Sequence, residues 1–170
     1  MSTVLVTGAT DGLGRALARD LAGRGHEVLV HGRDDARGEE TLEEIRRATR
    51  RKVLSIPADL TKVEDATSFV ESGARELGRL DILVNNAGIQ PVAPLESIED
   101  ADLAEMFRVN SVGVAAMTRE AVEYVVDHAA GLVVLDEAYA EFAPDVFTSL
   151  VTRSERLLVT RTFSKGFALG

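Results

Sequence analysis

The sequence predicts a doubly wound α/β fold, a three-layer sandwich in which helices cover both faces of a six-stranded parallel sheet. Six short runs rich in Val, Leu and Ile alternate with longer amphipathic segments. The short runs are apolar almost throughout, which is typical of parallel strands buried on both faces. The length of 170 residues and the hydrophobic content of 45% suit one domain. We therefore expect residues 1–170 to form a single domain.

The expected elements follow these runs in chain order. The first helix carries Leu13, Leu17 and Leu21 at helical spacing and ends at the glycines that follow. Because crossovers between parallel strands are right-handed, the expected fold is Rossmann-like with strand order 3-2-1-4-5-6. The expected strands are residues 3–7, 27–31, 52–56, 81–85, 132–136 and 157–160, and the further helices are residues 36–49, 63–77 and 100–128.

Charge and composition exclude several classes of partner. The formal charge is −9 and the pI about 4.9, so the chain lacks the excess of basic residues with which proteins bind nucleic acid or an anionic membrane. Without cysteine, the chain has neither a disulfide framework nor a thiolate metal site, and we expect no metal. No bilayer-spanning run and no signal-peptide pattern occurs, so a cytoplasmic or recombinant cytosolic setting is expected. The oligomeric state is left open.

The first expected strand runs into a glycine-rich turn, Thr7-Gly-Ala-Thr-Asp-Gly-Leu-Gly14. Gly8 permits a tight turn, Gly12 lets the backbone approach a pyrophosphate, and Gly14 lets the next helix pack closely on the sheet. The amino terminus of that helix offers N–H groups and a positive dipole end to an anion. The spacing GxxxGxG differs from the dehydrogenase fingerprint GxGxxG, and a packing turn without a ligand remains the alternative.

Three further motifs follow the glycine turn in order. They are Asp59-Leu60 after the third strand, Asn85-Asn-Ala-Gly88 after the fourth, and Val109-Asn110 in the next helix. With these four motifs, residues 1–119 closely resemble the short-chain dehydrogenase/reductase family. The resemblance implies a nucleotide cofactor as the partner. It gives Asn110 a part in a proton relay, with a helix residue bonding backbone at a bend as the alternative.

The same resemblance assigns the cofactor contacts. The glycine loop, with Asp11 and Leu13, would bind the pyrophosphate. Asp59 and Leu60 would border the adenine, and the cleft would be lined by Asn86, Ala87 and Gly88.

The end of the second strand indicates which cofactor is preferred. An NAD-dependent enzyme usually places an acidic residue there, whereas this chain has Arg33, whose guanidinium can grip a 2′-phosphate. The sequence therefore favours NADP(H). Asp34 and Asp35 oppose this preference, and Arg33 as an ordinary solvated charge is the alternative.

The family's hydride chemistry also needs a serine after the fifth strand and a tyrosine followed four positions later by a lysine. The lysine lowers the pKa of the tyrosine, which acts as acid or base. Tyr124 precedes His128 and Tyr139 precedes Ala143 at that spacing. We therefore expect reductase catalysis to be lost.

From about residue 120 onward the chain resembles histidinol-phosphate aminotransferase, an enzyme that uses pyridoxal phosphate. The resemblance is carried by residues 132–142 and 157–170. It implies that Asp136 pairs with the pyridine nitrogen, Tyr139 bonds the ring hydroxyl and Lys165 forms the Schiff base. The phosphate-binding loop is missing, so we expect no pyridoxal phosphate to bind. A polar strand end and an exposed lysine are the alternative roles of Asp136 and Lys165.

Together these patterns predict an engineered or recombined chimera, with residues 1–119 from a reductase and 120–170 from an aminotransferase, joined at residues 119–124 inside one helix. The predicted function is NADP(H) binding without turnover. The alternatives are a structural scaffold with no ligand, an NADP-dependent oxidoreductase and a pyridoxal-phosphate-binding fragment.

Overall fold

The computed structural model describes residues 1–90, 94–128, 133–136, 155 and 157–160. Its contacts divide the chain into two compact units, Met1–Ala121 and Val122–Gly170, and each is described by itself. The first unit contains a four-stranded sheet with its helices, and the second contains a two-stranded sheet. The assignment of residues 1–170 to a single domain stays a prediction.

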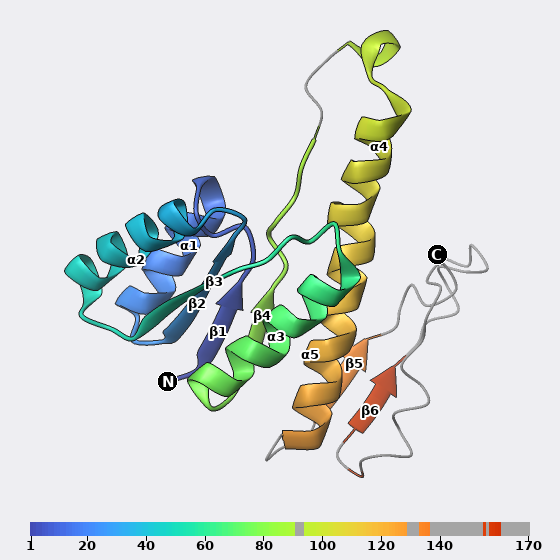
Figure 1. The fold of residues 1–170 in the computed structure, drawn as a ribbon. Helices are drawn as coiled ribbons and strands as arrows, with labels where there is room; N and C mark the ends of the chain where they lie inside the picture. The colour runs from blue at the N-terminus through green and yellow to red at the C-terminus, as the bar shows by residue number, and fades with distance from the viewer. Residues whose placement is uncertain (91–93, 129–132, 137–154, 156, 161–170) are drawn as a thin grey trace, which may run out of the picture. The chain divides into compact units, whose positions relative to one another are not determined.

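The sheet of the first unit contains β1 (Thr3–Val6), β2 (Glu27–Gly32), β3 (Val53–Pro57) and β4 (Ile82–Val84). All pairs are parallel and the order is β3-β2-β1-β4, with Val4 beside both Val28 and Ile82 (Figure 1). The first four positions of the predicted strand order are therefore confirmed. The buried apolar runs placed the boundaries of these strands to within one residue.

The predicted six-stranded sheet is wrong. Strands β5 (Val133–Asp136) and β6 (Leu157–Thr160) pair in parallel with each other, Val133 beside Leu157, as a separate two-stranded sheet. The apolar runs predicted both strands correctly, but pairing depends on long-range contacts that a local pattern does not contain. β4, the expected neighbour of β5, has only three residues and so offers few backbone groups for a further ladder.

Helices cover both faces of the four-stranded sheet. α1 (Gly12–Gly23) and α2 (Asp35–Thr49) lie on one face, and α3 (Val63–Leu77) lies on the other (Figure 1). Aspartate side chains begin the first two helices: Asp11 accepts a hydrogen bond from the N–H of Gly12 at 2.7 Å, and Asp34 accepts one from the N–H of Arg37 at 3.0 Å. These caps satisfy backbone donors that have no partner within the helix.

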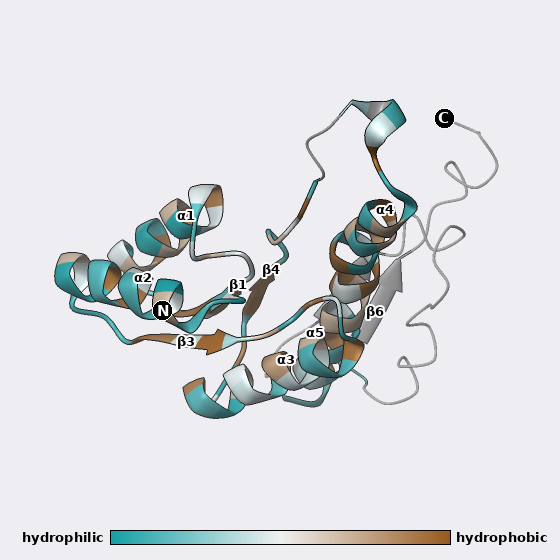
Figure 2. Ribbon diagram, turned by 45° about the horizontal axis from the view of Figure 1, so that its top comes forward, coloured by the Kyte–Doolittle hydropathy of each residue, from teal (hydrophilic) through white to brown (hydrophobic). Residues whose placement is uncertain are grey.

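The strands bury side chains on both faces, as their continuous apolar runs predict. Val4 and Val6 belong to a buried cluster with α1 and α2, whereas Leu5 and Leu29 face Gly73 of α3. All four strand side chains are fully buried. In Figure 2, β3 and β4 are brown (hydrophobic), while α2 is largely teal on its outer surface. Packing in the core therefore fixes the carboxyl ends of the strands, and the loops that follow β1, β2 and β4 start from these fixed positions.

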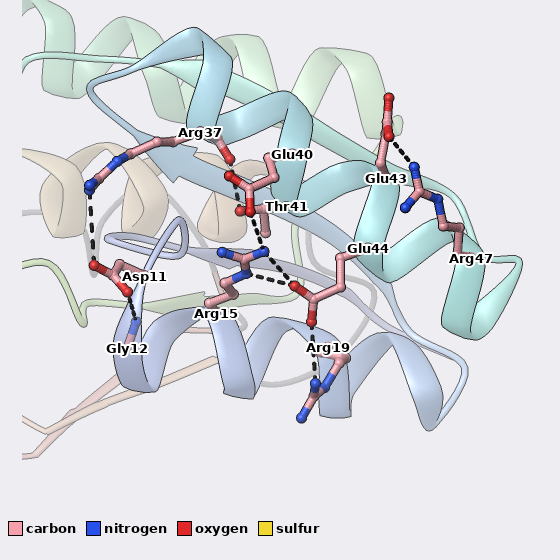
Figure 3. A network of polar contacts seen from close by, with 10 residues as sticks. All are labelled: Asp11, Gly12, Arg15, Arg19, Arg37, Glu40, Thr41, Glu43, Glu44 and Arg47. Carbon is pink, nitrogen blue, oxygen red and sulfur yellow. Dashed lines mark hydrogen bonds and ion pairs between the residues drawn. The ribbon is translucent and has the colours of Figure 1, made fainter.

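An ion-pair network joins α2 to α1 (Figure 3). The guanidinium of Arg15 on α1 contacts Glu40 at 3.1 Å and Glu44 at 2.5 Å, and Arg19 contacts Glu44 at 3.2 Å. The hydrogen bond from Arg15 holds the pKa of the Glu44 carboxyl below its ordinary value. This network orients α2, whose first turn carries Arg37.

The helix expected at residues 100–128 is present but not regular. It consists of α4 (Asp100–Phe107), a π-helical segment η2 (Arg108–Gly113) and α5 (Val114–His128), and a short 3₁₀ helix η1 (Leu95–Ser97) precedes it. A π-turn holds an extra residue, which hydrophobic spacing does not reveal, and it places Asn110 in the irregular turn. Among the described residues, no helix is both long enough and apolar enough to cross a bilayer.

Candidate cofactor site

A cleft of about 720 Å³ opens where the strands of the first unit end. The carboxyl ends of neighbouring parallel strands lie at one edge of a sheet. In the order β3-β2-β1-β4, successive strands are added on one side of β1 up to β3 and on its other side from β4, so the strand order reverses between β1 and β4. Ligands of open α/β sheets bind at such a reversal. The cleft is lined by Gly8, Thr10, Asp11, His31, Gly32, Arg33, Asp34, Arg37, Leu60, Ala87, Gly88, Ile89 and Val109.

The glycine loop packs directly against the loop after β4. Gly8 has a φ of 62°, and a Cβ at this position would lie 2.8 Å from the Cα of Ala87. A Cβ at Gly14 would collide with the carbonyl oxygen of Gly8. Both glycines are therefore required by the protein's own packing. By contrast, a Cβ at Gly12 would meet no heavy atom within 4 Å, so the space beside the start of α1 is open.

Thr7 and Asn86 lock these two loops together. The buried hydroxyl of Thr7 accepts hydrogen bonds from the N–H groups of Asn86 at 3.0 Å and Ala87 at 2.9 Å. The Asn86 side chain donates to the carbonyl oxygens of Thr7 at 2.9 Å and Gly8 at 3.2 Å. Ala87 and Gly88 line the cleft as expected, whereas the amide of Asn86 is used within the protein.

Sequence reasoning missed Thr7, although its position identifies it. A polar side chain at the last step of a buried strand, directly before a glycine turn, needs hydrogen-bond partners.

His31 connects three strand ends and was also missed. The N–H of Gly8 donates to its Nδ1 at 3.1 Å, and its Nε2 lies 3.1 Å from the carbonyl oxygen of Ala58. Both contacts are satisfied by the neutral ring that carries its proton on Nε2. The side chain is 2% exposed, and burial lowers the pKa of His31 below its ordinary value.

Two guanidinium groups reach the cleft. Arg33 follows β2 as predicted, and its guanidinium lies 3.9 Å from the carboxylate of Glu105 in α4. Arg37 in α2 was not predicted; it lies 3.9 Å from Asp11, toward which it extends in Figure 3. Both arginine side chains are 63% exposed and so remain accessible to a ligand. The expected helix start at residue 36 could have placed Arg37 one turn beyond Arg33.

The remaining predicted contacts are divided between the cleft and the local structure. Leu60 lines the cleft. Asp59 accepts hydrogen bonds from the hydroxyl of Thr61 at 2.7 Å and from its N–H at 3.1 Å, which hold the pKa of the Asp59 carboxyl below its ordinary value. The carboxylate is thus committed to the turn before α3. Leu13, the second residue of α1, is 77% exposed.

Asn110 holds the backbone of Ile89. Its Nδ2 donates to the carbonyl oxygen of Ile89 at 2.8 Å, and its Oδ1 accepts the N–H of the same residue at 2.9 Å. This is the backbone-bonding arrangement considered as the alternative, and it fixes a residue of the cleft wall. Its part in a proton relay stays a prediction.

The predicted pyridoxal-phosphate residues do not form a described site. Asp136 is the last residue of β5, and Tyr139 and Lys165 lie outside the described residues. Within the described part of the chain, no group of three or more His, Asp or Glu side chains could hold a metal ion.

Comparison with known proteins identifies the family. The sequence profile for "short chain dehydrogenase" matches residues 2–144. The chain is 36% identical over 136 residues to 11-beta-hydroxysteroid dehydrogenase A of Sesamum indicum, covering 79% of this chain and 39% of that enzyme.

Two solved structures are similar in both sequence and fold. A short-chain dehydrogenase from Sphingobium yanoikuyae in complex with NADPH is 28% identical with a TM-score of 0.68, covering 85% of this chain and 56% of that one. A short chain dehydrogenase from Mycobacterium smegmatis is 26% identical with a TM-score of 0.72, covering 85% and 61%. This chain spans about half the length of the curated relatives it matches.

These findings overturn the predicted chimera and its lack of turnover. The dehydrogenase profile continues through residues 119–124 and past Asp136, and the comparisons give no support to an aminotransferase portion or a pyridoxal-phosphate site. A short apolar strand followed by polar residues recurs in many α/β folds, so it was a weak basis for a second family. The matched proteins are oxidoreductases, which supports the alternative prediction of an oxidoreductase instead. This chain belongs to the short-chain dehydrogenase family, whose members bind NAD(P)(H).

Proposed function

We propose that this chain holds the cofactor of an NADP-dependent oxidoreductase that transfers hydride between the cofactor and a carbonyl or secondary-alcohol substrate. The observation that carries the proposal is the cleft at the β1–β4 reversal, which combines an open helix start with two exposed guanidinium groups. Its volume of about 720 Å³ suits a small-molecule ligand. The relatives named above are dehydrogenases, one of them solved with NADPH.

The preference for NADP(H) rests on Arg33 and Arg37. Each lies 3.9 Å from one carboxylate of the described residues, a long contact for an ion pair. A 2′-phosphate between them would replace these contacts by shorter, charge-assisted hydrogen bonds, for which the planar guanidinium is well suited. Asp34 lies on the same wall but is used as the cap of α2.

The pyrophosphate would lie at the start of α1. The open space beside Gly12 admits an anion, and the amino end of the twelve-residue helix stabilises negative charge. Asp11 accepts the N–H of Gly12, and its side chain is 82% exposed, so solvent and salt screen its charge from the ligand.

The nicotinamide ring supplies the hydride chemistry when the cofactor is bound. The residues of this chain orient it. Ala87, Gly88 and Ile89 form the wall after β4, and Asn110 fixes the Ile89 backbone at both its N–H and its carbonyl group. A wall held at both backbone groups can position a ring with little reorganisation.

Turnover tests this proposal. The full chain should oxidise NADPH in the presence of a panel of ketones, followed by the loss of nicotinamide absorbance. Gly14→Ala should abolish the reaction because its Cβ would collide with the carbonyl oxygen of Gly8 and distort the glycine loop. The surface variant Arg47→Ala should react like the parent, since Arg47 pairs with Glu43 outside the cleft. Oxidation that Gly14→Ala leaves unchanged, or none with any ketone, would count against the proposal.

A further inference from the structure

We propose that His31 is the positioning residue of the glycine loop, and that the loop keeps its cofactor-binding shape only while the His31 imidazole is neutral. The inference rests on the NADP(H) site proposed above. It predicts that cofactor affinity falls when His31 takes up a proton.

His31 occupies the centre of the loop cluster. It lies near the end of β2, between β1 and β3 in the sheet. Its Nδ1 accepts the N–H of Gly8, its Nε2 meets the carbonyl oxygen of Ala58, and its own carbonyl oxygen accepts the N–H of Ala9 at 2.8 Å. One residue therefore ties the loop after β1 to the loop after β3.

The contact with Gly8 determines the protonation state that the site tolerates. A second proton on the ring would sit on Nδ1 and face the N–H of Gly8 across 3.1 Å, placing two donors against each other. Gly8 has little freedom to move aside, because the space on one side of it is too small even for a Cβ, which would lie 2.8 Å from the Cα of Ala87. Protonation must therefore displace the glycine loop or the wall beside it.

The surroundings of the ring favour the neutral form. In the described part of the chain, the hydrogen bonds and ring contact of the imidazole involve uncharged groups: the Gly8 N–H, the Ala58 carbonyl and the Phe69 ring of α3, whose centroid lies 4.8 Å away. Burial lowers the pKa of His31 and outweighs the hydrogen bond to the Ala58 carbonyl, which raises it; the positive charge of Arg33 lowers it further. The other charged residues lining the same cleft are Asp11, Asp34 and Arg37.

Cofactor affinity measured between about pH 5 and 8 tests the inference. The probe is NADH beside NADPH, because NADH lacks the 2′-phosphate, which titrates in the same range. The parent chain should lose affinity for both as pH falls, approaching about tenfold per pH unit once His31 titrates. His31→Asn keeps an oxygen acceptor near the Nδ1 position and cannot titrate, so its affinity for NADH should stay constant.

His26→Asn is the matched control. His26 precedes the same strand, and its Nδ1 also accepts a backbone N–H, that of Ser2 at 3.2 Å, at the opposite end of the sheet from the cleft. This variant should keep the pH profile of the parent. A His31→Asn profile that falls as steeply as that of the parent would overturn the inference.

A measurement on the free protein separates this inference from the cofactor assignment. In nitrogen-detected NMR spectra, the His31 ring should carry its proton on Nε2 at neutral pH, and the Gly8 amide signal should shift with the titration of the ring. If neither nucleotide binds at any pH, the proposed function fails while this coupling still supports the role of His31. A ring that titrates without moving the Gly8 amide refutes that role, even if His31→Asn does not fold.

Discussion

The Thr7 hydroxyl oxygen lies 2.9 Å from the amide nitrogen of Ala87 and accepts its hydrogen bond, joining the end of β1 to the loop after β4. The same oxygen accepts the N–H of Asn86 and donates to the carbonyl of Val84 at 3.3 Å. A hydroxyl group has one donor and two acceptor sites, so its capacity is completely used. This one buried side chain therefore holds together the two loops, after β1 and after β4, between which the cofactor is proposed to bind.

Replacing Thr7 by Val should therefore cost more than the loss of one hydrogen bond. The substitution keeps the shape but leaves two N–H groups without their acceptor, and we expect unfolding to become easier by about 1–3 kcal/mol. Urea denaturation measures the change. Thr7→Ser retains the hydroxyl and should lose clearly less stability than Thr7→Val; a loss for Thr7→Ser equal to or greater than that for Thr7→Val would contradict a dominant role of the hydroxyl.

Two glycines of α1 should respond oppositely to alanine. At Gly14 the new Cβ collides with the carbonyl oxygen of Gly8, so Gly14→Ala should destabilise the fold by about 1–3 kcal/mol. At Gly23 the Cβ meets nothing within 4 Å, so Gly23→Ala should be neutral or stabilising by up to about 1 kcal/mol. Thermal melting of both variants makes the comparison. Similar melting temperatures would contradict the packing of the glycine loop.

Arg37 should contribute to the choice between the two cofactors. Arg37→Ala removes a charge-assisted contact with the 2′-phosphate, worth about 1.5–3 kcal/mol, which corresponds to roughly a tenfold to hundredfold weaker binding of NADPH. Binding of NADH should change little. The control is again Arg47→Ala, in the same helix but outside the cleft. Equal weakening of NADPH and NADH would indicate a structural effect rather than recognition of the phosphate.

Stability should also depend on the protonation of His31. Burial lowers its pKa in the folded protein, whereas the unfolded chain has the ordinary value near 6.5. Below about pH 6.5 the unfolded state therefore binds a proton that the folded state does not, and stability falls with decreasing pH until the folded-state pKa is reached. The slope approaches about 1.4 kcal/mol per pH unit.

His31→Asn should remove this contribution. The difference in unfolding free energy between the parent and the variant, measured in urea at several pH values below about 6.5, isolates it from the carboxylates that both share. A difference that stays constant with pH would contradict a buried, neutral His31.

Local sequence patterns predicted the features that depend on neighbouring residues, namely the positions of the strands and of the loops at their ends. The continuous apolar runs predicted each strand of the four-stranded sheet, and the strand ends with Gly8, Ala87 and Arg33 predicted where the cleft lies. The pairing of β5 with β6 depends on distant contacts, and the π-turn around Asn110 leaves the apolar spacing intact. The roles of Thr7 and His31 depend on hydrogen-bond partners more than twenty residues away, which no spacing rule reveals.

The aminotransferase interpretation failed for a related reason. It relied on two short segments after residue 131 and treated their residue types as evidence of a second family, although the phosphate-binding loop of that family is missing. The four motifs of the first portion were more informative because their order along the chain matches one family, and the profile match over residues 2–144 agrees with them.

Calorimetric titration of the full chain with NADPH and NADH in parallel tests the central claim most directly. We expect saturable binding of both, with NADPH bound more tightly, and we expect Arg33→Asp to erase that preference because the 2′-phosphate would meet a like charge. Absence of saturable binding by either nucleotide, or equal affinities in the parent chain, would contradict the assignment of this cleft to NADP(H).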